Sequence, residues 1–292
     1  MHILFACFLL KKKVTLSTLK LLVGKRKLYR DNYNYGVESL PKKLPKIVWI
    51  YWDRGIDAAP LAVQAAAHSW IDQNPGWDVR FVSESNLGGF SSIAVAPVPR
   101  KIQWRADVIR LRLLKEYGGV WADASSFATR PLDEWLPFLM QSGFFAFPET
   151  YPGRIMSNWF LAACPGNVLV AAWSDEVERI YFSHKKIKNY YWVMHLFEYL
   201  IVRNHKLRRI WDDTPKISMK GPILLKRVLS EPDYAEPLPD YVDENAIPVF
   251  KASSTTKFDS FELGQAIKHR RSFSIRRMIN ELLHPQNREK IQ

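Results

Sequence analysis

The chain has 292 residues, of which 47% are hydrophobic and 24% charged, a composition typical of a folded globular protein. This excludes a chain that is disordered throughout, and the length allows one large domain or two small ones. Two cysteines, Cys7 and Cys164, are too few for a disulfide framework or a cysteine-rich zinc site. We expect both to be reduced thiols in a cytosolic setting.

The net charge of +13 comes from the two ends of the chain. Residues 1–30 include eight basic and no acidic residues, and residues 268–292 include seven basic and two acidic ones. The middle, residues 31–267, has 27 of each sign. A nucleic-acid-binding protein would spread positive charge over its binding face, whereas basic tails on a neutral body favour an anionic membrane surface. The alternative is two solvated basic tails that bind no partner.

The N-terminal segment predicts contact with a membrane surface rather than a membrane span. The apolar run Ile3–Leu10 has eight residues, far fewer than the roughly 20 that a spanning helix needs. Basic residues follow this run instead of preceding it, unlike in a secretory signal. Leucines then recur at helical spacing among lysines, as in an interfacial helix. We therefore expect an appendage at 1–40, a folded domain at 41–267, a basic tail at 268–292, and a location on the inner face of the cell membrane.

The front half of the folded part alternates strands with helices. The predicted strands are Lys46–Trp52, Trp77–Ser83 and Val120–Ala122, and the helices between them are Leu61–Ile71 and Arg105–Tyr117. Later strands are expected at Phe144–Phe147, Trp159–Ala163 and Ile247–Lys251, and later helices at Asn167–Phe182 and Tyr190–His205. The alternation predicts an α/β fold with parallel strands, in which ligands bind at the carboxyl ends of the strands. Asp53 and Asp123 follow two of those ends.

The segment 105–132 has the most informative arrangement of charged residues. Asp107 and Arg110 lie three residues apart on one helix face, the pair Gly118-Gly119 ends that helix, and the next strand stops at Asp123. A helix end and a strand end could therefore converge on one ligand, with a carboxylate for a metal-bridged diphosphate and another for ribose hydroxyls. The alternatives are a surface ion pair and a turn aspartate. Neither GxGxxG nor GxxxxGK[ST] occurs, which disfavours dinucleotide oxidoreductases and P-loop enzymes.

The same segment carries the pattern R-x-D-x-x-R-x-x-x-L-x-x-x-G-G-V-W-x-D-x-S, followed by T-R-P-L-D-E-W. This pattern resembles that of the bacterial capsular polysaccharide synthesis proteins, which are related to the DxD-containing sugar transferases of glycosyltransferase family 32. The segments Leu44–Asp53 and Ser157–Phe160 agree with the resemblance, which covers about residues 41–260. It implies a GT-A-like, Rossmann-like nucleotide-sugar-binding fold with a mainly parallel central sheet. It also implies a hexosyltransferase that moves a sugar from a nucleotide-sugar donor to a glycan or lipid-linked glycan acceptor.

The resemblance also assigns candidate site residues. Asp107 and Arg110 match positions that contact the donor, and Asp123 matches the first aspartate of the DxD motif, as catalytic residue and metal ligand. Ser125 replaces the second aspartate, so Asp123 and Ser125 are the candidate ligands of Mn²⁺ or Mg²⁺. A hydroxyl is a neutral and weaker ligand, which predicts weaker metal binding than a complete DxD site would give.

Four further residues are candidates for binding the nucleotide-sugar. Lys251 and Lys257 could take the place of the cation electrostatically, since the strand before them should return to the same edge; the alternative is exposed surface lysines. Tyr51 and Trp52 end the first strand, which in this family lies beside the nucleotide base. Strand alternation turns one of these two side chains toward the core, so only one can stack on a base.

No catalytic base stands out in the sequence. Candidates are Asp53, Asp133, Glu149, Asp175 and His195, the last of which is more simply a core histidine. A retaining transferase would need no base, because the leaving diphosphate can accept the proton. Two other hypotheses remain beside the glycosyltransferase. One is a catalytically inactive sugar- or nucleotide-binding protein, suggested by Ser125. The other is a nucleic-acid-binding protein, which the neutral middle disfavours.

Overall fold

The computed structural model describes residues 43–90, 101–148, 154–183, 189–217, 219–223 and 247–253. The predicted appendage at 1–40 and the basic tail at 268–292 lie outside the described residues, and so do Lys257 and Glu149. The domain bounds and the membrane-surface segment therefore stay predictions. The described elements group into two compact units, the sheet unit and the helical unit, and each is described by itself.

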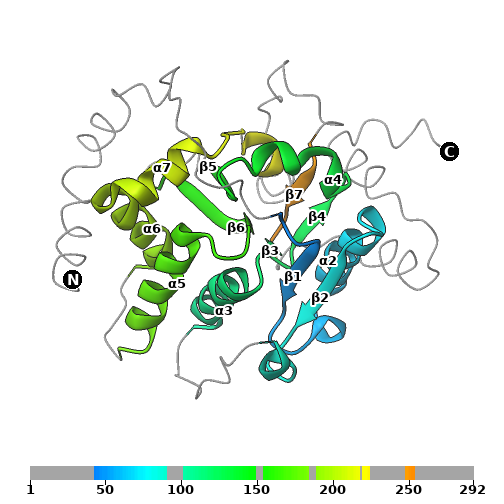
Figure 1. Ribbon diagram of the computed structural model, residues 1–292. Helices are drawn as coiled ribbons and strands as arrows, with labels where there is room; N and C mark the ends of the chain where they lie inside the picture. The colour runs from blue at the N-terminus through cyan, green and yellow to red at the C-terminus, as the bar shows by residue number, and fades with distance from the viewer. Residues whose placement is uncertain are drawn as a thin grey trace, which may run out of the picture. The chain divides into compact units, whose positions relative to one another are not determined.

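The sheet unit contains the predicted parallel strands (Figure 1). Its elements are β1 (Ile47–Tyr51), α2 (Leu61–Gln73), β2 (Asp78–Val82), β3 (Gly119–Ala122), β4 (Ser126–Ala128), α4 (Leu132–Trp135) and β7 (Val249–Lys251), with short 3₁₀ helices at Ile56–Ala58 and Leu87–Gly89. β1 pairs in parallel with β2 on one side and β3 on the other, and Val48 lies opposite Val79 and Val120. The predicted α/β fold with a mainly parallel central sheet is confirmed.

The sheet unit also contains a two-stranded antiparallel sheet, in which β4 pairs with β7 and Ser126 lies opposite Lys251. Helix α2 fixes β4 through two buried hydrogen bonds. The Ser69 hydroxyl accepts from the amide of Ala128 at 2.9 Å, and the indole N–H of Trp70 donates to the carbonyl of Ser126 at 2.9 Å. α2 therefore holds β4, and β4 in turn fixes the position of β7. The sequence analysis missed β4, since three residues are too few to show a period.

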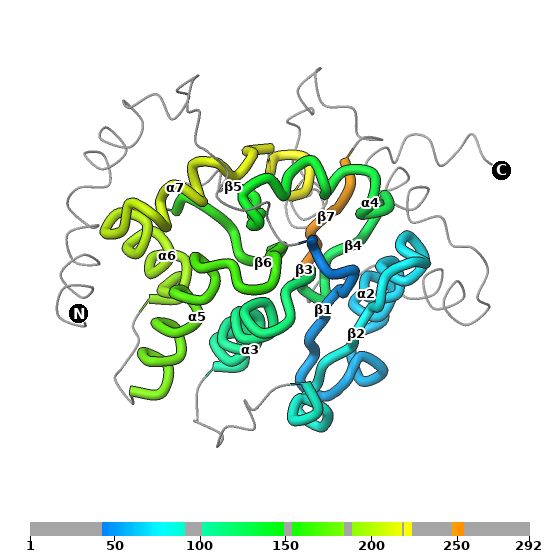
Figure 2. The backbone as a smooth tube through the Cα atoms, in the orientation of Figure 1, coloured from blue at the N-terminus to red at the C-terminus, as the bar shows by residue number. Residues whose placement is uncertain are grey.

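The helical unit contains α3 (Ile102–Glu116), β5 (Phe144–Pro148), β6 (Met156–Ala163), α5 (Val168–Tyr181), α6 (Trp192–Arg203) and α7 (His205–Asp213), with a 3₁₀ turn at Pro137–Leu139 on its border. β5 and β6 are antiparallel, and the tube in Figure 2 shows α3 running beside α5. Aromatic rings fill the core, with centroids 4.9 Å apart for Trp173–Phe197 and 5.3 Å apart for Phe197–Trp211. The predicted strands and helices of this unit are confirmed, whereas α7 was not expected.

The two consecutive glycines end α3 as the sequence predicts. Gly118 has φ 69°, and its amide donates to the carbonyl of Leu114 at 3.0 Å, which is the left-handed C-cap of an α-helix. Gly119 also has a positive φ, at 93°. The chain thereby turns from α3 into β3 within two residues.

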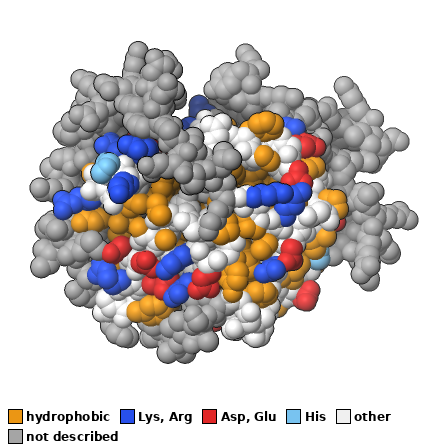
Figure 3. Space-filling view, viewed as in Figure 1, with side chains coloured by type: hydrophobic (Ala, Val, Ile, Leu, Met, Phe, Trp, Pro, Cys, Tyr) orange, Lys and Arg blue, Asp and Glu red, His pale blue; other side chains and the backbone are white. Residues whose placement is uncertain are grey.

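The described surface agrees with the neutral charge of the chain's middle. On the face shown in Figure 3, Lys and Arg side chains are interspersed with Asp and Glu side chains and with apolar ones. Among the described helices, none has the length and the apolar character that crossing a membrane requires.

Cys164 is a buried free thiol whose pKa is raised by desolvation, and Cys7 lies outside the described residues.

Candidate functional site

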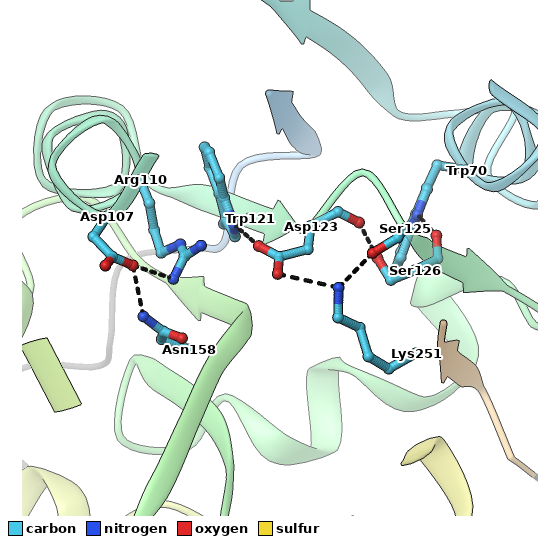
Figure 4. A network of polar contacts seen from close by, with 9 residues as sticks. All are labelled: Trp70, Asp107, Arg110, Trp121, Asp123, Ser125, Ser126, Asn158 and Lys251. Carbon is cyan, nitrogen blue, oxygen red and sulfur yellow. Dashed lines mark hydrogen bonds and ion pairs between the residues drawn. The ribbon is translucent and has the colours of Figure 1, made fainter. Parts of the chain in front are cut away.

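Asp123 follows directly on β3, at the carboxyl end of this parallel strand. The amide and hydroxyl of Ser126 donate to the carbonyl of Asp123 at 2.8 and 2.5 Å, which closes a tight turn over residues 123–126. The indole N–H of Trp121 donates to Asp123 Oδ1 at 3.0 Å (Figure 4). Asp123 thus lies in a turn, as one of the two interpretations of the sequence predicts. The hydrogen bond from Trp121 of β3 also orients its carboxylate.

Lys251 brings a positive charge to this turn from the other end of the sequence. Its Nζ lies 3.2 Å from Asp123 Oδ2 and donates to Ser125 Oγ at 2.6 Å. The side chains of Lys251 and Asp123 are 16% and 28% exposed, so the ion pair is partly shielded from water. The amide of Ala252 also donates to the carbonyl of Ser125 at 2.9 Å. The structure therefore brings together Asp123, Ser125 and Lys251, three of the residues that the sequence singles out.

This arrangement does not fit a bound divalent cation. Mg²⁺ demands near-octahedral coordination by about six oxygen ligands. The residues predicted to supply them are Asp123 and Ser125, and an oxygen of each contacts the Lys251 ammonium. Within the described part of the chain, no cluster of three His, Cys, Asp or Glu side chains could hold a metal ion. A metal ion on these oxygens would lie beside the like charge of the ammonium.

A second polar cluster lies in the helical unit, where Asp107 and Arg110 face each other on α3 (Figure 4). Arg110 Nη1 donates to Asp107 Oδ1 at 2.9 Å, and the side-chain amide of Asn158 on β6 donates to the same oxygen at 2.8 Å. The side chains of Arg110 and Asp107 are only 6% and 12% exposed. The pair is therefore not the exposed surface ion pair that the sequence left open as an alternative.

The sequence analysis gave Asn158 no role, although Asn158 belongs to the segment Ser157–Phe160 that carries part of the resemblance. Its partner Asp107 is 51 residues away in the sequence, and the contact is made because β6 lies against α3. The predicted convergence of Asp107 and Arg110 with Asp123 on one ligand concerns residues of two units, and it stays a prediction.

Changing Asp107 to Asn is expected to lower the free energy of unfolding by about 1.5–3 kcal/mol, the usual contribution of a charge-assisted buried hydrogen bond. Asn keeps the shape and one acceptor oxygen for Arg110 and Asn158, while the charge and the second acceptor are lost. Urea unfolding of Asp107→Asn, Arg110→Met and the double variant measures the coupling between the two side chains.

The control for this cycle is Glu134→Gln, because Glu134 on α4 forms a more exposed ion pair with Arg130, which lies before the helix, at 3.0 Å. That change should cost less than about 1 kcal/mol. Unchanged stability in Asp107→Asn together with weaker nucleotide binding would assign the Asp107–Arg110 pair to the ligand rather than to the fold.

The family model described as capsular polysaccharide synthesis protein matches residues 6–269 of the chain. The chain belongs to this family. The match confirms the resemblance carried by the segment 105–135.

The similar curated proteins are named as glycosyltransferases. The chain is 27% identical over 176 residues to "O-glycosyltransferase braB" of Annulohypoxylon truncatum, a match that covers 52% of this chain and 41% of the relative. It is 27% identical over 157 residues to "Glycosyltransferase afumC" of Aspergillus fumigatus, covering 44% and 38%. Over 104 residues it is 27% identical to the "Initiation-specific alpha-1,6-mannosyltransferase" of Saccharomyces cerevisiae, covering 32% and 22%. The matched part spans less than half the length of these relatives.

Two solved structures are also similar to the family member. One is the PaToxG glycosyltransferase, with a TM-score of 0.43 and 14% identity, covering 69% of this chain and 84% of that one. The other is the galactosyltransferase LgtC in complex with donor and acceptor sugar analogs, with a TM-score of 0.40 and 9% identity, covering 76% and 95%.

Tyr51, the last residue of β1, and Trp52, which follows it, lie in different surroundings. Trp49 is fully buried, and Tyr51 is 7% exposed and donates its hydroxyl to Glu84 Oε1 at 2.6 Å. Trp52 is half-buried, and its indole N–H makes no hydrogen bond within the described residues. Tyr51 is therefore the residue that faces the core, which leaves Trp52 as the candidate for stacking on a base.

Two of the candidate catalytic bases, Asp133 and Asp175, form ion pairs. Asp133 accepts from Lys46 Nζ at 2.6 Å and from the indole of Trp77 at 3.2 Å. Asp175 pairs with Lys115. Both are exposed ion pairs, one between α4 and the residue before β1 and the other between α5 and α3.

The remaining base candidates of the family member differ in their surroundings. His195 is buried within α6, as the core interpretation of its aromatic helix predicts. Asp53 is half-buried and follows β1, the parallel neighbour of β3, so it lies at the same sheet edge as Asp123. Among the base candidates that the structure describes, Asp53 is therefore the one that lies at the edge of the sheet with Asp123.

Proposed function

We propose that the chain is a glycosyltransferase that moves a sugar from a nucleotide-sugar donor to a glycan or lipid-linked glycan acceptor, in the synthesis of capsular or related surface polysaccharide. Membership of the capsular polysaccharide synthesis family and similarity to proteins named glycosyltransferases support this activity. The observation that carries the proposal is the Asp123 carboxylate, held by Trp121 and Lys251 at the carboxyl end of a parallel strand.

The chemistry of sugar transfer fits this strand edge. Departure of a nucleoside diphosphate concentrates negative charge on its phosphates, so a fixed positive charge near the leaving group lowers the barrier. The edge at the ends of β1 and β3 offers Lys251 as a cation, Asp123 to orient it, and Asp53 as a candidate base for the acceptor hydroxyl. A half-buried Trp52 at the same edge offers a surface for the nucleotide base.

The alternative is a binding protein on the same scaffold that has lost catalysis, and Ser125 in place of the second DxD aspartate motivates it. A thermal-shift screen with UDP-, GDP- and CMP-sugars identifies the donor. Donor hydrolysis and transfer then separate the two functions. An active transferase releases the sugar from the stabilising donor, whereas an inactive binder is stabilised and releases none. Stabilisation by no nucleotide-sugar would contradict both functions.

We further propose that the chain associates with an anionic membrane surface on the cytoplasmic side, because positive charge is concentrated in residues 1–30 and 268–292. Deletion of residues 1–30 is expected to reduce sedimentation with vesicles that contain phosphatidylglycerol, and salt should weaken the remaining binding. Neutral phosphatidylcholine vesicles are the control. Equal sedimentation of the full and truncated chains with anionic vesicles would refute a membrane role for the first 30 residues.

A further inference from the structure

We propose that the ammonium of Lys251 is the resident cation of the Asp123–Ser125 turn and takes the place of a divalent metal ion. The nucleoside diphosphate leaving group is then bound by a lysine, and donor binding is independent of metal. The claim that Lys251 binds the diphosphate rests on the proposed function. The claim that Lys251 takes the place of a metal ion does not.

The first argument is the position of the ammonium. Lys251 Nζ lies 3.2 Å from Asp123 Oδ2 and 2.6 Å from Ser125 Oγ, in the two side chains that the resemblance assigns to a metal. A metal ion on the same oxygens would lie at contact distance from the ammonium, where two cations repel each other. The Asp123 and Ser125 side chains are thus already bridged by a cation that belongs to the chain.

The second argument is the balance of charge. A DxD site has two carboxylates around a divalent cation, so the group is neutral before the diphosphate binds. Here Ser125 removes one negative charge, and Lys251 supplies one positive charge instead of two. Asp123 and Lys251 together are again neutral. The loss of the second aspartate is therefore matched by a monovalent cation.

The third argument is that strand pairing fixes the position of Lys251. It ends β7, which is paired with β4, and the side chain of Thr129 donates to the carbonyl of Ile247 at 2.6 Å just before β7. The Lys251 side chain is 16% exposed, so it is accessible to a bound anion while its charge is only partly screened by water.

The part that concerns the metal is tested with Mn²⁺ alone, by electron paramagnetic resonance on the full chain without nucleotide. The double variant Ser125→Asp/Lys251→Met, which restores two carboxylates and removes the ammonium, should bind Mn²⁺ at least about tenfold more tightly than the wild type. Adding Asp123→Asn to it should abolish that gain. Wild-type binding as tight as that of the double variant, and lost in Asp123→Asn alone, would overturn the proposal.

The part that concerns the ligand is tested by calorimetry with the nucleoside diphosphate of the donor that the thermal screen identifies. Its dissociation constant should be the same in EDTA as in Mg²⁺. Lys251→Met should weaken its binding about ten- to a hundredfold, while binding of the nucleoside without phosphates stays unchanged. Lys46→Met is the matched control, because Lys46 pairs with the exposed Asp133 in the same unit, and it should change nothing.

A loss of diphosphate affinity of tenfold or more in EDTA would overturn the proposal, and so would unchanged affinity in a folded Lys251→Met variant. If no nucleotide binds at all, the proposed function fails, whereas the Mn²⁺ titrations still decide which cation the turn holds.

Discussion

An Asp123→Asn variant is expected to lose sugar transfer by about 100-fold or more while it stays folded. The Asp123 carboxylate accepts from Trp121 through Oδ1 and pairs with Lys251 through Oδ2. Asn keeps the shape of the side chain but removes the charge and leaves one acceptor oxygen for the two donors, so the Lys251 ammonium is no longer held by an opposite charge. A transition state that depends on a fixed positive charge at the leaving diphosphate then loses its stabilisation. Initial transfer rates at saturating donor measure the effect, and circular dichroism checks the fold.

Asp133→Asn provides the control for this experiment. It makes the same chemical change in the same unit, at an aspartate whose side chain is 51% exposed and paired with Lys46. Its transfer rate should stay within about twofold of the wild type, because an exposed ion pair contributes little. Near-wild-type transfer by a folded Asp123→Asn variant would remove Asp123 from the site and with it the assignment of this strand edge.

The largest loss of stability is expected from Gly118→Ala, at roughly 3–5 kcal/mol, from a strained left-handed backbone and an overpacked contact together. Gly118 has φ 69°, and a Cβ there would lie 2.8 Å from the carbonyl oxygen of Ala163 and 2.9 Å from the amide nitrogen of Pro165. These are backbone atoms of the same unit, which can yield only if α3 or the end of β6 shifts. Chemical unfolding followed by tryptophan fluorescence gives the difference in free energy.

Gly55→Ala separates the two contributions. Gly55 also has a positive φ, at 87°, but among the described residues no atom beyond its chain neighbours lies within 4 Å of the position that its Cβ would take. This control variant should lose about 1–3 kcal/mol, the cost of a backbone conformation that is almost confined to glycine. A loss of no more than about 1–2 kcal/mol in Gly118→Ala, the cost of a left-handed residue alone, would show that close packing between Gly118 and the end of β6 contributes nothing.

The sequence by itself determined the elements whose signals are local. The run Ile47–Tyr51 is β-branched and aromatic and forms a strand with a parallel neighbour on each side, and Gly118 ends α3 because its backbone can adopt a positive φ. The strand–helix–strand order predicted the parallel pairing, since a crossover helix returns the chain in the same direction. These features depend on residues that are near each other in the chain, so periodicity and turn chemistry reveal them.

Helix α7 shows that a local signal can also be overlooked. Asn204 caps it by accepting from the amides of Lys206 and Leu207, and Asn is a strong N-cap residue. The helix starts directly after α6, and the continuous pattern of the two obscured the boundary. Strand β4 had no local signal, because its three residues form a strand only through α2 and β7.

The contacts of the candidate site were decided by the tertiary structure alone. Lys251 reaches Ser125 across 126 positions of sequence, and Asn158 reaches Asp107 across 51. Neither distance leaves a trace in composition or period, because each contact depends on how a distant strand pairs or packs. The sequence therefore named Asp123, Ser125 and Lys251 as separate candidates. Only the pairing of β4 with β7 placed the lysine ammonium against both oxygens, where a metal ion had been the simpler expectation.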